Sequence, residues 1–434
     1  MRRRPRAMIN WRSRMLASRP GAGRAVCRQR QRGVAMLAML TLLTLWGMYL
    51  FLGQLSTFQV RMGRTQSALA AMAEARDALI GDAISRSPVS DAGYLRLPDL
   101  GADLDPGVGW VPAEGGPSPS FLGNQKDLSV IGKFPWKTKT GQLASPPLRD
   151  AQQECLWYVV SGRFKIVPKT DAMNWDTAGQ IDIIDSNGNL IATNLAALLV
   201  APGQALDGQN RALADPIYTE CGGNYDARNY LDSFNATEST SAQVNYFAGS
   251  TNHRLAPNTN NKRFVIADSD HYNDLFLYIT VDDIFKPLIR RNDFSDAIGR
   301  LLDDPAFQNH LRSIDVTGSK GTDKLSCSSF APDDDFCNSW KEMLFLAQLS
   351  PPSQITINGL PSSQICSRVL IFGGRKAVGQ IRNTATEKAD KNNYLEGNNL
   401  TSFNVPNASS TSFSGSTGNF NAASPSTDLV RCLP

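Results

Sequence analysis

The stretch Val34-Ala-Met-Leu-Ala-Met-Leu-Thr-Leu-Leu-Thr-Leu-Trp-Gly-Met-Tyr-Leu-Phe-Leu-Gly53 is the longest apolar run in the sequence. Its 20 residues carry no charge, and a helix of that length covers ~30 Å, the thickness of the hydrocarbon layer of a bilayer. The apolar part of a secretory signal is typically shorter, ~7–15 residues, and ends in a small-residue cleavage site, which does not follow here. We therefore expect a membrane-spanning helix; the alternative is a buried core helix.

The residues on either side of this run predict its orientation. Residues 1–33 contain eleven Arg, no Lys and no acidic residue. Because basic residues stay on the cytoplasmic side of a membrane, we expect a basic cytoplasmic leader at 1–33 and an exported body. Residues 34–434 keep 33 basic and 40 acidic residues, a net charge of −7, and no second run of comparable length. A mildly acidic body argues against a nucleic-acid partner.

A helical pattern continues beyond the apolar run. Residues 56–86 contain no Pro and many Ala, and a stripe with three- and four-residue spacing is typical of one buried helix face: Leu69, Met72, Ala73, Arg76, Leu79, Ile80 and Ala83. Pro88 ends the pattern. The sequence predicts a helix over 34–86, about 80 Å long at ~1.5 Å per residue, with its first half in lipid and its second half on the body.

The junction Arg28-Gln-Arg-Gln-Arg-Gly33, followed at once by the apolar run, resembles the type IV prepilin class. The resemblance implies that a prepilin peptidase in the bacterial inner membrane cuts after Gly33 and methylates Val34. Pilins usually carry Glu at the fifth mature position, where this chain has Ala38. Some minor pilins and the tip pseudopilin of type II secretion share that departure, which favours a minor subunit. The alternative is a signal anchor that is not cleaved.

A set of short segments further resembles large prepilin-like proteins of Gram-negative bacteria, which are mostly uncharacterised. The first is Ala73-Glu-Ala-Arg-Asp-Ala-Leu-Ile-Gly-Asp-Ala83. The others follow in the same order: Leu97-Pro-Asp99, Gly132-Lys-Phe-Pro-Trp-Lys137, Leu148-Arg-Asp150, Leu156-Trp-Tyr-Val-Val-Ser161, Ala201-Pro-Gly-Gln-Ala205, Gly208-Gln-Asn-Arg211, Asn229-Tyr-Leu-Asp232 and Asp282-Asp-Ile-Phe285. This resemblance covers roughly residues 30–290. It implies a place in the cell envelope and a pilin-like start, and no known activity.

The exported body is expected to be β-rich after a Pro- and Gly-rich loop region at 87–150. Short β-branched or aromatic runs predict strands at 156–160, 180–184, 195–200 and 276–280. Asn187-Gly188 predicts a hairpin, because this pair tolerates the positive φ of a type I′ turn. The fold class is α+β, with a long N-terminal pilin-like helix and a β-rich body.

A second block repeats this plan at a constant offset of 171 residues. Asn187-Gly188 matches Asn358-Gly359, and Gly208-Gln-Asn-Arg211 matches Gly379-Gln-Ile-Arg382. We interpret this as an internal duplication, with copy 1 at 151–286, a mainly helical connector at 287–336 and copy 2 at 337–434. Copy 2 includes an Asn/Ser-rich loop and a final strand at 428–432, and residues 339–347 read as helical. We expect the Gln and Arg of each copy to tie loop backbone together; ligand binding is the alternative.

Six of the seven cysteines lie in the exported part, and an even number in an oxidising compartment suggests disulfides. They are Cys155, Cys221, Cys327, Cys337, Cys366 and Cys432. Six cysteines allow 15 pairings, which sequence cannot fix. We expect Cys327–Cys337, Cys155–Cys221 and Cys366–Cys432; buried free thiols are the alternative. A cysteine-based metal site is not expected, because no C-x-x-C occurs and His is scarce.

The sequence contains no recognisable catalytic motif. There is no H-E-x-x-H, no G-x-S-x-G and no Walker A loop, and the three histidines are His253, His271 and His310. We expect no cofactor. Asp268-Ser-Asp-His-Tyr-Asn-Asp274 and Asp333-Asp-Asp335 could supply oxygen ligands to Ca²⁺, although solvated loop acids are the commoner explanation.

These observations favour a non-enzymatic, prepilin-like minor component of a type IV pilus or a type II secretion-like assembly. Its partners would be inner-membrane lipid, other pilin or pseudopilin subunits and the prepilin peptidase. One alternative is a signal-anchored periplasmic module that binds glycan or a surface partner without joining a filament. A membrane-anchored hydrolase is a further alternative.

Overall fold

A computed structural model of the chain describes residues 31–99, 127, 129–138, 141–142, 148–212, 227–232, 262–267, 272–314, 326–404 and 411–434. Helices and several β-sheets are present, as the α+β class predicts. The chain divides into two compact units, Met1–Met62 and Gly63–Pro434.

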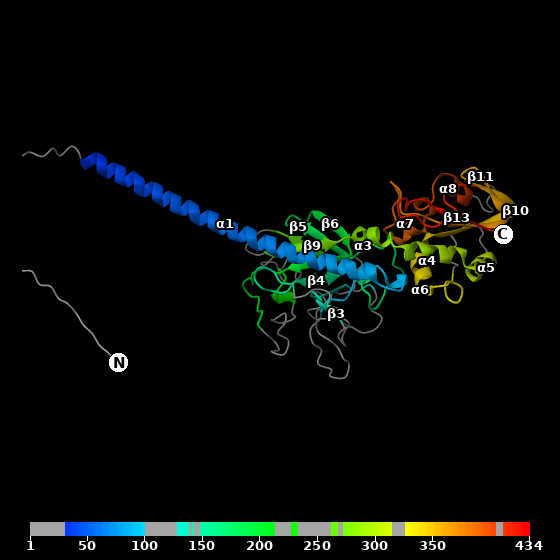
Figure 1. Cartoon of the computed structure of the whole chain (residues 1–434), viewed down its shortest axis with the longest axis horizontal. Coiled ribbons are helices and arrows are strands. Elements are labelled where there is room, and N and C mark those ends of the chain that lie inside the picture. The colour runs from blue at the N-terminus through cyan, green and yellow to red at the C-terminus, as the bar shows by residue number, and fades with distance from the viewer. Residues whose placement is uncertain are drawn as a thin grey trace, which may run out of the picture. The chain divides into compact units, whose positions relative to one another are not determined.

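The first helix, α1, spans Gln31–Ser85 and is continuous over its 55 residues (Figure 1). Within it, Val34–Phe51 has a mean hydropathy of 2.0, and none of these residues is buried. Among the described residues, α1 is the one helix long and apolar enough to cross a membrane, a property that N-terminal signal sequences share.

The second half of α1 contributes one face to the core of the larger unit. Its buried residues follow the three- and four-residue spacing of a helix face: Ala68, Met72, Ala75, Leu79 and Ala83. The predicted stripe is partly wrong, because Leu69 is 42% exposed and Ala73 is also exposed. Apolar character alone did not distinguish neighbouring positions in an Ala-rich segment.

The end of α1 is held by a residue that lies far away in the sequence. The last turn of α1 has no basic residue, and the final carbonyls of a helix need donors from elsewhere. Arg291 supplies them by donating to the carbonyl oxygens of Ile84 and of Arg86, the latter at 3.0 Å. Arg291 lies between α3 (Val281–Leu288) and α4 (Asn292–Asp303).

An antiparallel sheet in the order β1-β4-β7-β9 packs in the same core as α1. Its strands are β1 (Val130–Lys133), β4 (Trp157–Val160), β7 (Ala197–Ala201) and β9 (Leu275–Ile279). Successive side chains of a strand point to opposite faces. Tyr158 and Val160 share the core of α1, whereas Trp157 and Val159 belong to a second core. Burial on both faces explains why β4 and β7 are continuously apolar.

The second core also contains residues of a smaller sheet in the order β6-β5-β8. Strands β5 (Ile181–Asp185) and β6 (Leu190–Leu195) form the predicted hairpin, and β8 (Lys262–Ile266) runs parallel to β5. Only Gly188 of the Asn-Gly pair has a positive φ, 84°, so this turn is not the predicted type I′.

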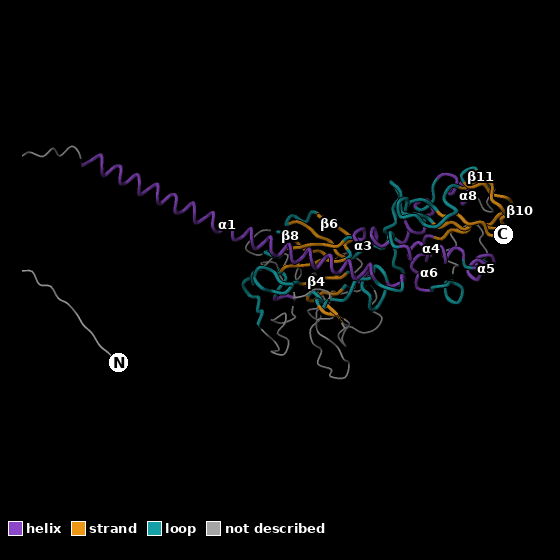
Figure 2. The backbone as a smooth tube through the Cα atoms, viewed as in Figure 1, coloured by secondary structure: helices purple, strands orange, loops and turns teal. Residues whose placement is uncertain are grey.

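The C-terminal part contains a sheet in the order β12-β10-β11-β13. Its strands are β10 (Leu344–Ile357), β11 (Leu360–Phe372), β12 (Ser412–Phe413) and β13 (Leu429–Leu433). Figure 2 shows the strands in two groups, and this sheet is the one near the C-terminus. The helices of this part are α4, α5 (Pro305–Ser313), α6 (Asp334–Trp340), α7 (Ala385–Ala389) and α8 (Gly397–Asn404). At its hairpin, Asn358 and Gly359 both take positive φ, 51° and 80°, as a type I′ turn requires.

The described part of the loop region at 87–150 contains few regular elements, and one of them, β1, pairs with β4. One further prediction for local structure is wrong. Residues 339–347 do not form one helix, because α6 ends at Trp340 and β10 begins at Leu344. A short apolar run is compatible with either a strand or a buried helix, and here pairing of β10 with β11 decides.

Candidate functional site

Several of the short segments singled out in the sequence meet at one place in the body. We call this place the buried charge cluster, defined by Asp99, Lys133, Asp150, Glu154, Arg211, Tyr230, Asp232 and Asp274. Apart from Arg211 and Glu154, each of these residues is buried. The side chain of Arg211 is 8% exposed and that of Glu154 is 26% exposed.

Tyr230 lies at the centre of the cluster. Its ring centroid is 5.1 Å from Lys133 Nζ and 4.9 Å from Arg211 Cζ. The ring of Trp157 packs against it with centroids 4.9 Å apart. A cation over an aromatic face is attracted to the ring quadrupole, more strongly when water is excluded. Tyr230 therefore joins two buried cations that come from different segments.

Arg211 ties the surrounding loops together, the structural role expected for it. Its guanidinium donates to the carbonyl oxygens of Asn229 and Gly203, each at 2.8 Å, and to Gln209 Oε1 at 2.9 Å. Arg211 Nη1 also lies 3.6 Å from Glu154 Oε1. These hydrogen bonds provide donors for backbone carbonyl oxygens that lie outside the strands and so have no partner in a sheet.

Three carboxylates of the cluster accept hydrogen bonds from backbone N–H groups of the loops around it. Asp150 accepts hydrogen bonds from the backbone N–H groups of Gln152, Glu154 and Gly203. Asp232 accepts from the backbone of Asn273 and of Asp274, while Asp274 accepts from the backbone of Asp232. Burial raises the pKa of Asp150 and of Asp232. Burial, together with the charge of Asp232, raises the pKa of Asp274 well above its usual value.

Lys133 is the buried amine of the cluster. Burial lowers its pKa to about 8, although the charges of Asp99 and Glu154 raise it. Asp99 lies directly opposite Lys133 in an antiparallel bridge, and the two residues exchange both backbone hydrogen bonds, at 2.8 and 2.9 Å. Gly132 makes this approach possible, because a Cβ there would lie 2.4 Å from the carbonyl oxygen of Asp99.

The second Gly-Gln-x-Arg loop makes the same hydrogen bonds. Arg382 donates to the carbonyl oxygens of Asn393 at 2.6 Å and Gly374 at 3.0 Å, and to Gln380 Oε1 at 3.1 Å. Its Cζ lies 4.0 Å from the ring centroid of Tyr394, which packs on Phe345. Each contact described for Arg211, except the one with Glu154, has a counterpart at Arg382.

Arg382 has one partner of a different kind. Its Nη1 lies 2.9 Å from Oδ2 of Asp176, and the two side chains are 1% and 2% exposed. Asp176 belongs to the loop between β4 and β5, so this ion pair joins the two β-rich parts of the body. The neighbouring Asn174 donates from Nδ2 to the carbonyl oxygen of Ser339 at 2.9 Å.

Trp175 lies beside this ion pair and inserts into the C-terminal part. Its ring is 4% exposed and contacts four aromatic rings: Phe294, Trp340, Phe372 and Phe420. The closest centroid, that of Trp340, is 4.7 Å away. We call Asn174, Trp175 and Asp176 the wedge.

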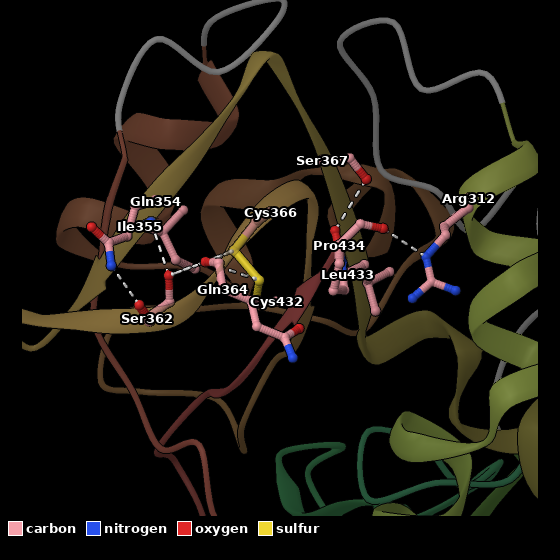
Figure 3. Close-up of a disulfide and its surroundings, with 10 residues drawn as sticks. All are labelled: Arg312, Gln354, Ile355, Ser362, Gln364, Cys366, Ser367, Cys432, Leu433 and Pro434. Carbon is pink, nitrogen blue, oxygen red and sulfur yellow. Dashed lines mark hydrogen bonds between the residues drawn. A yellow bond between two sulfur atoms is a disulfide. The ribbon is translucent and has the colours of Figure 1, made fainter.

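Two of the expected disulfides are present. Cys327 bonds to Cys337, and Cys366 bonds to Cys432. Figure 3 shows the second one, which attaches β11 to the last strand, β13. Near it, the guanidinium of Arg312 donates to the carbonyl oxygen of Pro434 at 3.0 Å. Cys155 is disulfide-bonded as well, and its expected partner Cys221 lies outside the described residues.

The remaining candidates from the sequence do not converge on one site. Gly33 and Val34 lie in α1, and the side chain of Val34 is exposed. Asp333 caps α6, and Asp335 Oδ2 lies 3.3 Å from Lys169 Nζ. The described residues hold no group of three His, Cys, Asp or Glu that could bind a metal ion. His310 stacks on Phe330, while His253, His271 and residues 268–271 lie outside the described residues.

The buried acids and lysines predict an unusual dependence of stability on pH. Burial raises the pKa of Asp428 to about 6, so the folded chain binds more protons than the unfolded chain between about pH 4 and 6, and stability falls as pH rises through that window. Burial lowers the pKa of Lys165 to about 8, so stability rises again above pH 8.

Urea unfolding of the full chain at pH 4.5, 7 and 9.5 tests this expectation. We expect the lowest free energy of unfolding at pH 7, with Asp428 contributing about 2 kcal/mol to the rise toward pH 4.5. Asp428→Asn should remove its share of the rise on the acid side and leave the alkaline side unchanged. A maximum at pH 7 would contradict the burial of these charges.

Sequence reasoning missed the cluster as a site, although the quoted segments contain most of its residues. Asp99 and Lys133 could have indicated buried charges, because each is a charged residue next to apolar ones, in Leu97-Pro-Asp99 and Gly132-Lys-Phe134. Only the fold shows that these segments meet. Comparisons of the chain with protein-family models, with curated proteins and with solved structures found no match.

Proposed function

We propose that this chain is a non-enzymatic, prepilin-like component of a bacterial envelope assembly, anchored in the inner membrane by α1. Its N-terminus would lie in the cytoplasm and its body in the periplasm or outside the cell. The observation that carries the proposal is α1 itself. One uninterrupted helix, Gln31–Ser85, combines an exposed apolar segment, Val34–Phe51, with a second half that is buried in the core of the body.

This continuity favours an anchor over a removable signal sequence. Removal of a signal would cut α1 after its apolar segment, whereas cleavage after Gly33 leaves that segment attached to the body. The disulfides Cys327–Cys337 and Cys366–Cys432 favour an oxidising compartment such as the periplasm. Pilin and pseudopilin subunits would then be the partners of α1 within the bilayer, where close helix packing drives association.

We further propose that the body is a tandem duplication. The matched hydrogen bonds of Arg211 and Arg382 support it. The pairing of strands also matches, since Trp157 faces Val200 as Phe345 faces Ile371. Within this proposal, the first copy carries the anchor and the second is attached to it by the wedge.

Intact-mass measurement of the protein from native membranes tests the proposal. We expect the loss of residues 1–33 and a methyl group on Val34. Gly33→Leu should retain the leader, because the peptidase of this class requires Gly before the cut. Gly47→Leu is a matched control, since a Cβ at Gly47 would meet nothing within 4 Å, and it should be processed normally. A mature start beyond Phe51 would overturn the proposal in favour of a signal sequence.

A further inference from the structure

Asp99 and Lys133 form a buried amine–carboxyl pair with unusual geometry. Each residue is 1% exposed, and they lie directly opposite each other across an antiparallel bridge. Opposite residues of such a bridge place their side chains on the same face, with Cβ atoms ~4.5–5.5 Å apart. The six bonds from Cβ of Lys133 through Nζ to Cβ of Asp99 could span up to ~7 Å. A covalent bond between the two side chains would therefore fit without moving the backbone.

The surroundings favour the neutral form of the amine. An isolated charge is costly in a medium of low dielectric constant, so burial shifts an amine toward NH₂ and a carboxyl toward COOH. Lys133 follows this rule, since burial lowers its pKa to about 8. The charges of Asp99 and Glu154 raise that pKa and the charge of Arg149 lowers it. Nζ of Lys133 lies 5.1 Å from the ring centroid of Tyr230, on which Trp157 packs, and both aromatic residues are nearly fully buried.

We propose that Lys133 and Asp99 condense to an isopeptide bond, which joins the segment after α1 to strand β1. A proton first passes from Nζ of Lys133 to the carboxylate of Asp99. The neutral Nζ then attacks Cγ of the carboxyl group, forming the N–C bond. Glu154 carries a proton from the nitrogen to the departing hydroxyl, the C–O bond breaks, and one water molecule leaves. The products are a secondary amide and water, so no oxidant, cofactor or further reactant is needed.

Holding the reactants in place makes this condensation possible without an activated acyl group. Two groups fixed by the fold react as if at effective concentrations of ~10⁵–10⁸ M. Exclusion of water removes the competing hydrolysis. The same two groups in water would remain an ion pair, because their pKa values differ by several units there.

The bond would have a mechanical consequence. Asp99 lies 14 residues after the end of α1 at Ser85, and Lys133 ends β1 in the sheet of order β1-β4-β7-β9. Force applied through α1 would reach the sheet through this amide as well as through packing. The inference does not depend on the proposed assembly, because the chemistry requires only the folded body.

Mass spectrometry of the full-length chain, purified in detergent, reduced and alkylated, tests the proposal. We expect an intact mass lower than the calculated value by one water molecule. We also expect a protease fragment in which the peptides around Asp99 and Lys133 are joined. Lys133→Arg and Asp99→Ala should each restore the full mass, because neither pair can form the amide. Lys165→Arg is the matched control, since Lys165 is also buried with its pKa lowered to about 8, and it should keep the cross-link.

The outcome separates the cross-link from an ordinary buried ion pair. Full calculated mass in the unmodified sequence, with separate Asp99 and Lys133 peptides, would overturn the proposal. Glu154→Gln should fold and retain the full mass. A Glu154→Gln protein that still lacks one water would overturn the proton-carrying role given to Glu154.

Discussion

Replacing Trp175 with alanine is expected to lower the free energy of unfolding of the body by about 3–5 kcal/mol, the usual cost of truncating a buried tryptophan. The ring fills a space lined by Phe294, Trp340, Phe372 and Phe420. The first three of these residues come from α4, α6 and β11, and Phe420 comes from the loop before β13. Loss of the ring would leave a cavity that a tightly packed core cannot close without moving several of them.

Urea unfolding followed by brief proteolysis of the full chain measures this effect. Trp175→Phe is the matched control, because it keeps an aromatic ring and should cost clearly less than alanine. If Trp175→Ala changes the midpoint of unfolding no more than an exposed substitution such as Val378→Ala, the wedge does not hold the two parts together.

Replacing Arg382 with methionine is expected to cost about 3–5 kcal/mol, because it would leave Asp176 charged, buried and unpaired. The carboxylate of Asp176 lies 2.9 Å from the guanidinium, and both side chains are at most 2% exposed. Arg211→Met is an internal control at the equivalent position. Its acidic partner Glu154 is farther away, at 3.6 Å, and 26% exposed, so water can compensate part of the loss.

A double-mutant cycle separates the ion pair from the loop contacts that Arg382 shares with Arg211. Asp176→Asn combined with Arg382→Met should cost less than the two single losses added together, because no unpaired charge remains. Equal costs for Arg382→Met and Arg211→Met, with strictly additive values in the cycle, would show that Asp176 contributes nothing to the attachment.

Much of the local structure could be predicted from particular residues. The charge-free run from Val34 and the Ala-rich segment after it specify a helix by composition and period alone. The strands around Trp157, Ile183 and Leu199 follow from short β-branched and aromatic runs. The pairs Cys327–Cys337 and Cys366–Cys432 match the expected pairing, although spacing alone cannot select one pairing of six cysteines.

The tertiary arrangement could not be predicted in the same way. Asp99 and Lys133 are 34 positions apart, and they lie side by side because Lys133 belongs to strand β1. The sequence did not predict this strand, because it lies in a Pro- and Gly-rich region. The wedge was hidden for a similar reason. Asn174, Trp175 and Asp176 lie in a loop, and no periodicity indicates which side chain of a loop inserts into another part of the chain.

The repeat could be predicted from the sequence only in part. The constant offset predicted that Arg211 and Arg382 would occupy equivalent loops, and their hydrogen bonds agree. The offset could not predict the difference between them. The acid beside Arg211, Glu154, is not the equivalent of Asp176. The connection between Val160 and Gln180, which carries Asp176, is long in the first part, whereas Gln348 and Gln354 are joined by five residues in the second.

The membrane topology of α1 tests the central claim most directly. Two reporters would be fused after Pro434 and compared in cells: one is active only in the periplasm, and the other is fluorescent only in the cytoplasm. Alkaline extraction of the membranes would show whether the protein is inserted in the bilayer. The account predicts an active periplasmic reporter, a dark cytoplasmic one, and a protein that resists alkaline extraction. A fluorescent C-terminal fusion, or release of the full-length protein into the soluble fraction without detergent, would contradict it.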